Sequence, residues 1–510
     1  MNNDRNKEIF KKKVEGINID PHEAWAIYGT GNGAELIYTV FCELHLESTI
    51  KAIVDRDEVS DKKIGFHGIT VCRLLDICDA LDGIVIAAFD NHEVIKNRIY
   101  DSLSEEQLNR INVIDIFVYN TKDDKKAYVE FIESSILRKS EEFIGFDEQG
   151  YQKKEGDTKV IAWYLPQFHQ MEINNKFHGQ GFTEWTNTSR AIPLFTGHYQ
   201  PHIPYDVGYY DLLNLDTFKR QIYLAKHYGI YGFCMHYYWF SGQRIMEKPL
   251  ELFLEHKELD MPFCLDWATE NWTALWDGGD QEVMLEQNLM EDDDWKFMRD
   301  ILPYMSDPRY IKIHGKPVLV IYRINIFERR RFRKLLHNFR EIARNNGFPD
   351  LYIMVTNAFD FKEDSAEWGA DALVEFPPHI VQSLMEKYRP EGYLNPYFNG
   401  RILDASSFIK HHRYMLKHNG QPYFRTALVS WDNAARKSIS KGFIMQGLTP
   451  KTFRQWMRDI VMESKQIHTE EENIVFVNAW NEWAEGAHLE PDMKYGYAWL
   501  QEVKNVLEGH

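Results

Sequence analysis

The second part of this chain repeats one pattern eight times: a short apolar run that turns polar or aromatic where it ends. Such runs are typical of buried strands, and most are separated by enough residues for a helix. They are Val160–Phe168, Tyr231–Phe240, Phe263–Asn271, Pro317–Arg323, Tyr352–Phe359, Ala372–Pro377, Arg425–Asn433 and Ile474–Trp483. Eight strand–helix units over about 350 residues predict a (β/α)8 barrel of the TIM type, whose active site forms at the carboxyl ends of the strands. A doubly wound open sheet is the alternative.

Amphipathic stretches between these runs supply the expected helices. They are Leu215–Tyr228, Asp293–Tyr304, Ile326–Asn346, Ser406–Asn419 and Lys451–Ile467.

The first 145 residues have a smaller α/β pattern. Strands are expected at Ala24–Tyr28, Ile50–Val54, Ile84–Phe89 and Ile111–Phe117, with a helix at Glu35–Leu46. This layout predicts a Rossmann-like domain at residues 1–145. We interpret the highly charged residues 119–158 as a helix and a solvated linker, with the linker at 146–158 and the barrel domain at 159–510. A surface helix and loop inside one larger domain is the alternative.

Charge and cysteine content exclude several classes of function. The chain has 59 basic and 77 acidic side chains and a formal charge of −18. An acidic chain repels phosphate backbones, so no nucleic-acid partner is expected. The five cysteines show no CxxC pairing, which is typical of free thiols in a reducing compartment. The N-terminus has no apolar signal region and no run approaches a membrane span, so we expect a cytoplasmic protein without a transmembrane segment.

A glycine-rich loop follows the first expected strand. Gly29, Gly31 and Gly33 lie where that strand gives way to a helix, and Asp55 ends the next strand. Glycines let the backbone approach a pyrophosphate at a helix N-terminus, and an acid at the position of Asp55 can bind a ribose. The loop therefore indicates a nucleotide or nucleotide sugar as cofactor. The alternative is a domain of this shape that binds no dinucleotide and serves for docking. No hydride-transfer machinery is recognisable elsewhere.

The strongest local signal is NAWNEWAEG at residues 478–486, directly after the last apolar run. Glu482 and Glu485 are three residues apart, so a helical turn would project both carboxylates to one side, with Cβ atoms about 5–6 Å apart. Carboxylates that close perturb each other, and one can stay protonated as an acid while the other is a base. Glycosidic-bond chemistry needs this division, which makes both candidate catalytic residues. A solvated acidic loop that caps a helix is the alternative.

Aromatic, amide and acidic groups gather at other strand ends, and aromatic residues make up 14% of the chain. Trp and Tyr rings can stack on sugar C–H faces, while carboxylates and amides bind sugar hydroxyls. Each such residue alone is also compatible with core packing, and Asp266 with structural pairing beneath the site. The candidate substrate-binding residues are Tyr164, Gln167, His169, Glu184, Trp185, His236, Tyr238, Trp239, Asp266, Trp267, Glu270, Asn271, Trp272, Glu375, Trp431, Asp432, Asn433, Asn478, Trp480, Asn481 and Trp483.

Two further signals carry little weight. Residues 291–294 (EDDD) contain a DxD, the metal–nucleotide motif of many sugar transferases, but a helical pattern begins there and acidic residues favour a helix N-terminus. The 20 histidines form no HExxH pattern and no tight His/Cys cluster, so no metal site is expected.

The motifs of the second part resemble a known family. WYLPQFH, GFTEWTN, HYQPHIPYDVGYYD, YGFCMHYYWF, WATENWT, DPRYIKIHGKPVLVIYR, EFPPH, WDNAAR and NAWNEWAEGAHLEPD are similar, in order, to motifs of WbsX-type proteins of bacterial surface-polysaccharide gene clusters. The resemblance extends from about Lys159 to the C-terminus and implies a glycosyltransferase. The barrel of that family is similar to the barrel of glycoside hydrolase family 99, the endo-α-mannosidase type. The N-terminal region more weakly resembles accessory nucleotide-binding-type domains of polysaccharide enzymes.

The resemblance also implies roles for the two glutamates. NEWAEG in this chain is similar to NEWHEG in the hydrolases, whose two glutamates carry catalysis. By this resemblance Glu482 is the base that activates the sugar 2-hydroxyl and Glu485 is the general acid. The implied route is retaining and passes through a 1,2-anhydro sugar instead of the usual carboxylate nucleophile. Ala484 replaces the histidine of the hydrolases, and Thr269 replaces the usual asparagine of WbsX proteins.

The prediction is therefore a carbohydrate-active enzyme of bacterial surface polysaccharide (O-antigen or capsule) biosynthesis. Its substrate is an oligosaccharide or glycan, and other polysaccharide-assembly enzymes are candidate partners. Transfer is the label of the family, whereas an endo-acting, retaining hydrolysis is the chemistry that the carboxylates most directly suggest. A noncatalytic glycan-binding scaffold is the alternative from another class.

Overall fold

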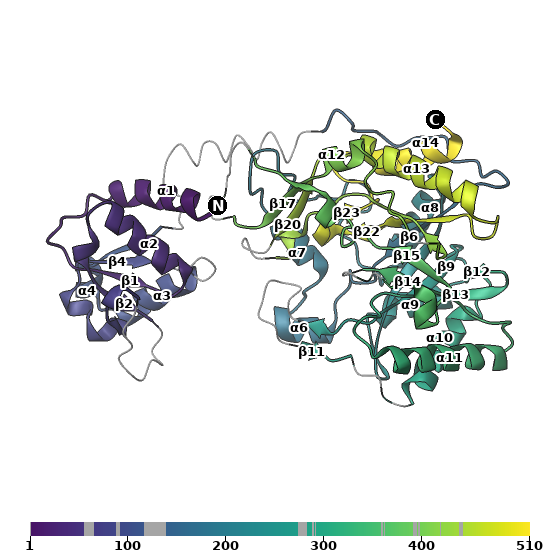
Figure 1. The fold of residues 1–510 in the computed structure, drawn as a ribbon, viewed down its shortest axis with the longest axis horizontal. Helices are drawn as coiled ribbons and strands as arrows, with labels where there is room; N and C mark the ends of the chain where they lie inside the picture. The colour runs from purple at the N-terminus through teal and green to yellow at the C-terminus, as the bar shows by residue number, and fades with distance from the viewer. Residues whose placement is uncertain are drawn as a thin grey trace. The chain divides into compact units, whose positions relative to one another are not determined.

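The computed structural model describes residues 2–55, 66–87, 92–116, 139–273, 283–287, 290, 292–358, 361, 363–390, 395, 398–418, 420–437 and 442–510. The helix predicted in the charged region after Phe117 lies outside these residues. The chain forms two compact units (Figure 1). The first comprises Met1–Ile132, Leu194–Thr196 and Glu391–Asn399, and the second comprises Glu133–Pro193, Gly197–Pro390 and Gly400–His510.

The first unit contains a parallel sheet of order β3-β2-β1-β4-β5. Its strands are β1 (Trp25–Tyr28), β2 (Ile50–Val54), β3 (Val71–Cys72), β4 (Gly83–Ile86) and β5 (Asn112–Asp115), and its helices are α1 (Asn2–Glu15), α2 (Asn32–Glu43), α3 (His92–Ser102) and α4 (Glu105–Arg110). The apolar runs of β1 and β4 are buried along their whole length, as central parallel strands are. The sequence does not predict β3, because two residues show no period.

The second unit is built on parallel strands in the order β15-β14-β13-β9-β7-β6-β21. These strands are β6 (Lys159–Tyr164), β7 (Ile230–Phe240), β9 (Phe263–Ala268), β13 (Lys316–Ile321), β14 (Tyr352–Asn357), β15 (Ala372–Glu375) and β21 (Ile474–Asn478). Each coincides with the apolar start of a predicted run. The polar or aromatic end of each run continues beyond the strand or forms its last residues.

One broken strand brings the two edges of this sheet together. β18 (Tyr423–Phe424) pairs with β15, and β19 (Thr426–Leu428) pairs with β21, so only Arg425 separates the two pairings. The strands therefore form a nearly closed parallel barrel instead of an open sheet. The prediction of an α/β fold with a barrel of parallel strands is therefore confirmed.

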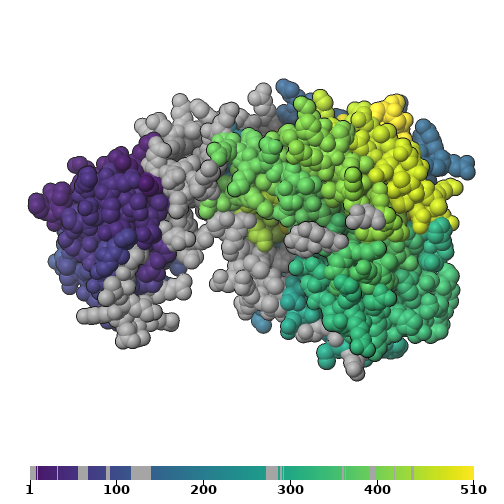
Figure 2. Space-filling model, in the orientation of Figure 1, coloured from purple at the N-terminus to yellow at the C-terminus, as the bar shows by residue number. Residues whose placement is uncertain are grey.

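Helices surround the barrel. They are α8 (Leu215–His227), α9 (Glu247–Glu255), α10 (Asp293–Met305), α11 (Arg329–Asn345), α13 (Pro450–Ile467) and α14 (Ala498–Glu508), with the shorter α6 (Glu172–His178), α7 (Glu184–Arg190) and α12 (Ala405–Lys410). Within this unit α13 packs against α14 and α10 against α11, and the two pairs occupy opposite ends of the face in Figure 2, yellow and teal. The predicted helix from Ser406 ends early, because His412 has a positive φ of 50°.

Short strands complete the unit. They are β8 (Gln243–Ile245), β10 (Trp272–Thr273), β11 (Val283–Leu285), β12 (Lys312–Ile313), β16 (Glu386–Lys387), β17 (Arg401–Asp404), β20 (Phe443–Gln446), β22 (Asn481–Glu482) and β23 (Ala487–His488). None of the described helices has a stretch that is long and apolar enough to cross a lipid bilayer.

The described part of the charged region, residues 139–158, belongs to the second unit and packs on the rest of it. Ile144 forms a parallel bridge with Gly496, and Phe146 stacks on His227 with ring centroids 4.8 Å apart. The backbone N–H of Tyr151 donates to the carbonyl of His227. The few aromatic and aliphatic residues in this charged stretch therefore hold it against the barrel unit.

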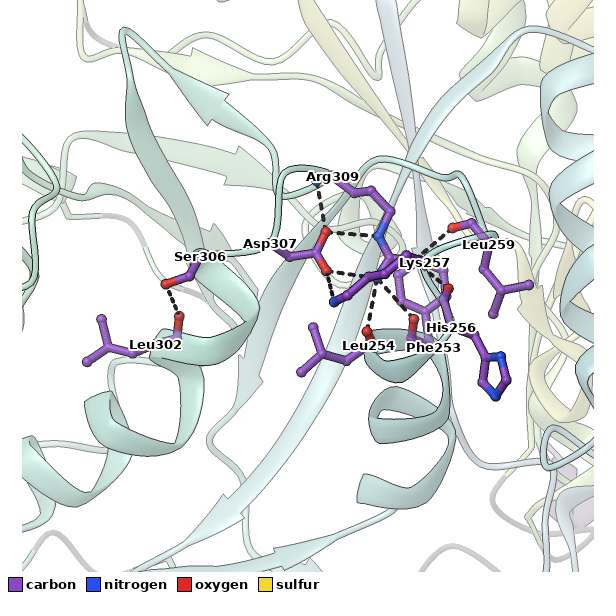
Figure 3. A network of polar contacts seen from close by, with 9 residues as sticks. All are labelled: Phe253, Leu254, His256, Lys257, Leu259, Leu302, Ser306, Asp307 and Arg309. Atoms are coloured by element: carbon purple, nitrogen blue, oxygen red, sulfur yellow. Dashed lines mark hydrogen bonds and ion pairs between the residues drawn. The ribbon is translucent and has the colours of Figure 1, made fainter.

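A charged cluster fixes the C-terminal end of α9 (Figure 3). The Arg309 guanidinium donates to the carbonyl oxygens of Phe253, Leu254, His256 and Leu259, which follow or end this helix. Asp307 accepts from the same guanidinium. Arginine thus satisfies carbonyls that have no partner inside the helix.

Candidate active site

The carboxyl ends of the barrel strands surround a cavity of about 700 Å³. Ala268 at the end of β9 and Asn478 at the end of β21 both face it. Leu165, Tyr322 and Phe376 directly follow the ends of β6, β13 and β15 and line it too. A volume of this size is typical of ligand sites and accommodates a few sugar rings.

Glu482 and Glu485 lie on a tight turn beside this cavity, and both line it. Glu482 ends β22, and the 3₁₀ turn Trp483–Glu485 follows before the chain returns as β23. Gly486 closes the turn with φ 65°, a conformation that suits glycine. The chain thus turns helically after the last barrel strand, and the two carboxylates face one cavity.

The buried guanidinium of Arg436 contacts three carboxylates. Its Nη2 lies 2.6 Å from Oε1 of Glu482 and 3.1 Å from Oε2 of Glu184, and its Nη1 lies 3.0 Å from Oε1 of Glu485. The Gln167 amide also donates to both carboxylate oxygens of Glu482. One cation thus fixes the positions of the two candidate catalytic groups relative to each other.

The pKa of both cavity glutamates lies above its ordinary value. Burial first, and then the neighbouring carboxylates of Glu485 and Glu184, raise the pKa of Glu482 to about 8, although Arg436 opposes the shift. Burial and Glu184 also raise the pKa of Glu485 against the same guanidinium. Both carboxyl groups therefore hold a proton more strongly than an exposed glutamate does.

A histidine–aspartate pair forms another part of the cavity wall. Nδ1 of His236 lies 2.7 Å from Oδ2 of Asp266, whose side chain is completely buried. His236 and Tyr238 line the cavity, whereas Asp266 lies behind the imidazole. Asp266 thus acts on the cavity through His236, in agreement with the structural alternative that the sequence left open.

The rim of the cavity carries further predicted residues. Glu270 accepts from Nη1 of Arg323 at 2.6 Å, and the side-chain oxygen of Asn271 accepts from the backbone N–H of Gln287. Trp431 and Asn433 also line the cavity. An indole, two amides and an ion pair are groups that bind sugar rings and hydroxyls.

Two predicted tryptophans turn away from the cavity toward a buried carboxylate. The indole N–H groups of Trp480 and Trp483 donate to Glu490, which also accepts from Tyr210 and Gln221. Burial raises the pKa of Glu490 to about 7. These indoles therefore support the turn of Glu482 and Glu485 on the side that faces away from the cavity.

Other predicted residues lie in the core around the site. The Tyr164 hydroxyl donates to Gln221 and the Trp239 indole to Asp300, and Trp267 packs on Phe297. Similar buried positions are taken by His169, Trp185 and Asn481. Of Trp272, the structure describes only the position in β10.

Two predicted acids belong to other places in the barrel unit. Glu375 is buried and accepts from Arg425 and contacts His418, at the point where the barrel closes. Asp432 lies 2.5 Å from Nε2 of His198 and accepts from Gln200, and it lines a second cavity of about 230 Å³. Neither carboxylate lines the cavity of Glu482.

Several cavity residues were not predicted from the sequence. They are Arg436, Lys437, Tyr322, Arg323, His379, Phe376 and Gln287. Most lie within a few residues of the end of a strand, so their closeness to an apolar run was the available signal. For Arg436 the signal was its place at the end of the WDNAAR motif. In the structure this arginine is only 1% exposed.

The glycine loop of the first unit has the local geometry that its sequence predicts. Gly29, with φ 124°, follows β1, and Gly31 caps the N-terminus of α2, which includes Gly33. The Thr30 hydroxyl donates to the carboxylate of Asp55 at 3.0 Å. The loop thus places the start of α2 next to the end of β2.

A parallel β-barrel with paired carboxylates, amides and an indole at the carboxyl ends of its strands has the groups that enzymes acting on glycosidic bonds use. The family model described as "Glycosyltransferase WbsX" matches residues 160–503. The chain belongs to this family, so the resemblance read from the sequence motifs is confirmed.

Two curated proteins are similar to this chain over most of its length. The chain is 36% identical over 350 residues to the uncharacterized protein WxcX of Xanthomonas campestris pv. campestris strain ATCC 33913, and 35% identical to WxcX of strain B100. The match covers 68% of this chain and 49% of each relative, so the chain spans about half the length of these relatives.

Similar solved structures include a glycoside hydrolase-like protein, with a TM-score of 0.44 and 15% identity over 72% of this chain and 98% of that one. Another is the GH99 endo-alpha-mannosidase from Bacteroides thetaiotaomicron, with a TM-score of 0.43 and 13% identity over 68% of this chain and 96% of that one.

Proposed function

We propose that this chain makes or breaks a glycosidic bond in the assembly of a bacterial surface polysaccharide, with Glu482 and Glu485 as the proton-transfer pair. One observation carries the proposal: both carboxylates reach the same buried guanidinium, Arg436, in the wall of a cavity large enough for sugars. The family assignment supports a glycan substrate.

In the proposed reaction Glu482 removes the proton from the sugar 2-hydroxyl while that oxygen attacks C1. The bond from C1 to the leaving oxygen breaks as Glu485 protonates that oxygen, which gives a 1,2-anhydro sugar. An acceptor hydroxyl then attacks C1 and passes its proton to Glu485, while the 2-oxygen recovers the proton held by Glu482. The reaction starts from an ionised Glu482 and a protonated Glu485. The raised pKa of Glu485 favours its role as the acid, and the pKa of about 8 at Glu482 means that the reactive ionisation state grows as pH rises toward 8.

Replacement of either glutamate tests the proposal. Glu482→Gln and Glu485→Gln keep the size of the side chain and remove its proton chemistry, so we expect turnover at least about 100-fold lower. Glycan affinity should change by only a few-fold. Turnover is measured on repeat-unit oligosaccharides, with and without a panel of nucleotide sugars, and Glu155→Gln on an exposed loop is the matched control.

The outcomes separate the alternatives. A product that forms only with a nucleotide sugar means transfer, and sugar release without a donor means hydrolysis. Full activity in both variants would contradict the assigned roles, and glycan binding without turnover in the wild type would favour the scaffold.

We also propose a Rossmann-like first unit that binds a nucleotide or nucleotide sugar, and a cytoplasmic location. The parallel strand order and the position of Gly31 at the start of α2 support the first. Five free cysteines, none in a disulfide, support the second. We place the unit at residues 1–145, before the linker and the barrel domain.

A further inference from the structure

The second cavity of the barrel unit contains a set of side chains that no part of the proposed reaction uses. His202, His488 and Asp492 all line this cavity of about 230 Å³. Their ligand atoms, one imidazole nitrogen from each histidine and one carboxylate oxygen, lie within 4.8 Å of one another. All three residues are buried, with at most 5% of their surface exposed. Nδ1 of His202 and Nε2 of His488 lie 2.8 Å apart.

The two imidazoles are held in fixed orientations. His488 stacks on Trp483 with ring centroids 3.7 Å apart, and His202 stacks on Tyr199 at 4.1 Å. Nδ1 of His488 bonds to the carbonyl of Glu490, which as an acceptor fixes the ring proton on Nδ1. The lone pair of His488 Nε2 therefore faces His202. Histidines that bind metals are usually oriented in this way by a carbonyl behind the ring.

The carboxylate of Asp492 has one oxygen with several donors and one without. Oδ1 accepts from the Tyr199 hydroxyl and from the backbone N–H groups of Lys494 and Tyr495. Oδ2 is buried and has no hydrogen-bond partner among the described residues. A buried carboxylate oxygen without a partner is costly, and a metal ion is one group that would satisfy it.

We propose that His202, His488 and Asp492 bind one divalent transition-metal ion, with Zn²⁺ as the ion that two imidazoles and one carboxylate suit best. The ion joins the loop after Gly197 to the segment from His488 to Asp492, just beyond the turn that carries Glu485. Its role is to hold these two segments together. The site does not depend on the proposed glycosidic chemistry.

The proton between the two imidazoles must move before a metal ion binds, because a metal ion takes the lone pair of an unprotonated ring nitrogen. In the absence of metal, the proton on His202 Nδ1 satisfies His488 Nε2; with metal bound, this proton moves to Nε2 of His202. Tetrahedral Zn–N bonds of about 2.0–2.1 Å separate two nitrogens by about 3.3 Å, so the rings must part by about half an ångström.

The cavity holds charges of both signs. Asp432 adds a second carboxylate, whereas Lys494 is a competing cation. Its ammonium lies 4.5 Å from the centre of the Tyr199 ring. The cavity has room for solvent to complete the coordination of the ion.

The test uses the full chain without a histidine tag, stripped of metal by a chelator and then titrated with Zn²⁺. Elemental analysis after dialysis should find about one ion per wild-type chain. Saturating Zn²⁺ should raise Tm by a few degrees, because the ion binds only the folded state. Co²⁺ in its place should give the visible absorption of a nitrogen- and oxygen-ligated site.

Variants assign the ion to this site. His488→Gln and Asp492→Asn should bind Zn²⁺ at least ten-fold more weakly, whereas His412→Gln, at an exposed histidine paired with Asp459, should bind it like the wild type. If His488→Gln does not fold, His202→Asn takes its place, and circular dichroism without metal checks each variant. A wild type that retains no ion, or variants that retain it fully, would overturn the proposal and leave a hydrogen-bonded histidine pair.

Discussion

A single guanidinium organises the candidate active site. Arg436 contacts Glu184, Glu482 and Glu485, and its surface is only 1% exposed. Lysine could supply the charge but not the rigid set of donors that a guanidinium offers to several carboxylates. Geometry at this residue therefore matters as much as charge.

Arg436→Lys tests this reasoning. With fewer fixed donors, the ionised carboxylates are less stabilised, so the pKa of the coupled pair should rise and the acid limb of the pH–rate profile should move to higher pH. Turnover at pH 7 should fall by about 10- to 100-fold, since the pair is less well positioned. Arg299→Lys on the exposed face of α10 is the control, and an unchanged profile in Arg436→Lys would contradict the role of the guanidinium.

The raised pKa of Glu482 predicts a pH-dependent stability. A carboxyl group with a pKa of about 8 when folded and about 4.3 when unfolded keeps its proton only in the folded state between these values. Its contribution to stability is complete below pH 4.3 and is lost as pH rises toward 8. Glu482→Gln should therefore gain about 1–3 kcal/mol relative to the wild type between pH 5 and pH 8.

Denaturant unfolding at the two pH values measures this difference. The free energy of unfolding of the exposed variant Glu155→Gln should change with pH in the same way as that of the wild type. An equal free-energy difference between Glu482→Gln and the wild type at pH 5 and pH 8 would exclude a raised pKa.

The sequence predicted that Glu482 and Glu485 face one cavity, and both line it in the structure. It could not tell which of the other residues at strand ends line the cavity and which pack in the core. Side chains alternate along a strand, so Trp163 points into the barrel against Phe376 while its neighbour Tyr164 points outward to Gln221 on α8. An aromatic residue near a strand end therefore has either fate. The buried Glu490, which turns two indoles away from the cavity, is three-dimensional information that no spacing contains.

At the level of elements, the strands were more predictable than the contacts between them. Long apolar runs identified the parallel strands, because a strand buried on both faces needs such a run. The break at Arg425 was not predicted, because the expected apolar run Arg425–Asn433 begins at this residue and leaves out Tyr423 and Phe424 before it. In the structure, pairing to β15 ends at Phe424 and pairing to β21 begins at Thr426.

The end of α9 depends on one arginine, which makes a second stability prediction. Burial alone would raise the pKa of Asp307, but hydrogen bonds from Arg309 and Lys257 hold it well below the usual range. Arg309→Met removes the donors to four carbonyl groups and leaves Asp307 with less compensation. We expect a loss of about 2–4 kcal/mol in the free energy of unfolding.

Urea unfolding of Arg309→Met measures this loss, with the exposed Arg299→Met as the control. Arg309→Lys should recover part of the stability through Asp307 alone. A loss under about 0.5 kcal/mol would mean that solvent replaces the guanidinium at these carbonyls.

At the scale of the whole molecule, the first unit offers a clean test of nucleotide binding. A Cβ atom at Gly31 would meet nothing within 4 Å, and its φ of −88° suits any residue, so Gly31→Val should fold. A branched side chain at the start of α2 would block the approach of a pyrophosphate. We expect at least ten-fold weaker binding of nucleotide sugars by calorimetry in the full chain. An affinity equal to that of the wild type would favour the docking alternative.

The broken barrel strand has a consequence for how this sequence can diverge. At Arg425, where backbone pairing passes from β15 to β21, a buried ion-pair cluster reinforces the closure, because the guanidinium lies between Glu375 and Glu463 with only 4% of its surface exposed. Loss of one partner from such a buried pair destabilises a protein by about 3–5 kcal/mol, whereas replacement of all partners by apolar residues is often tolerated. Homologues should therefore keep these three positions or exchange them together, as a single evolutionary unit.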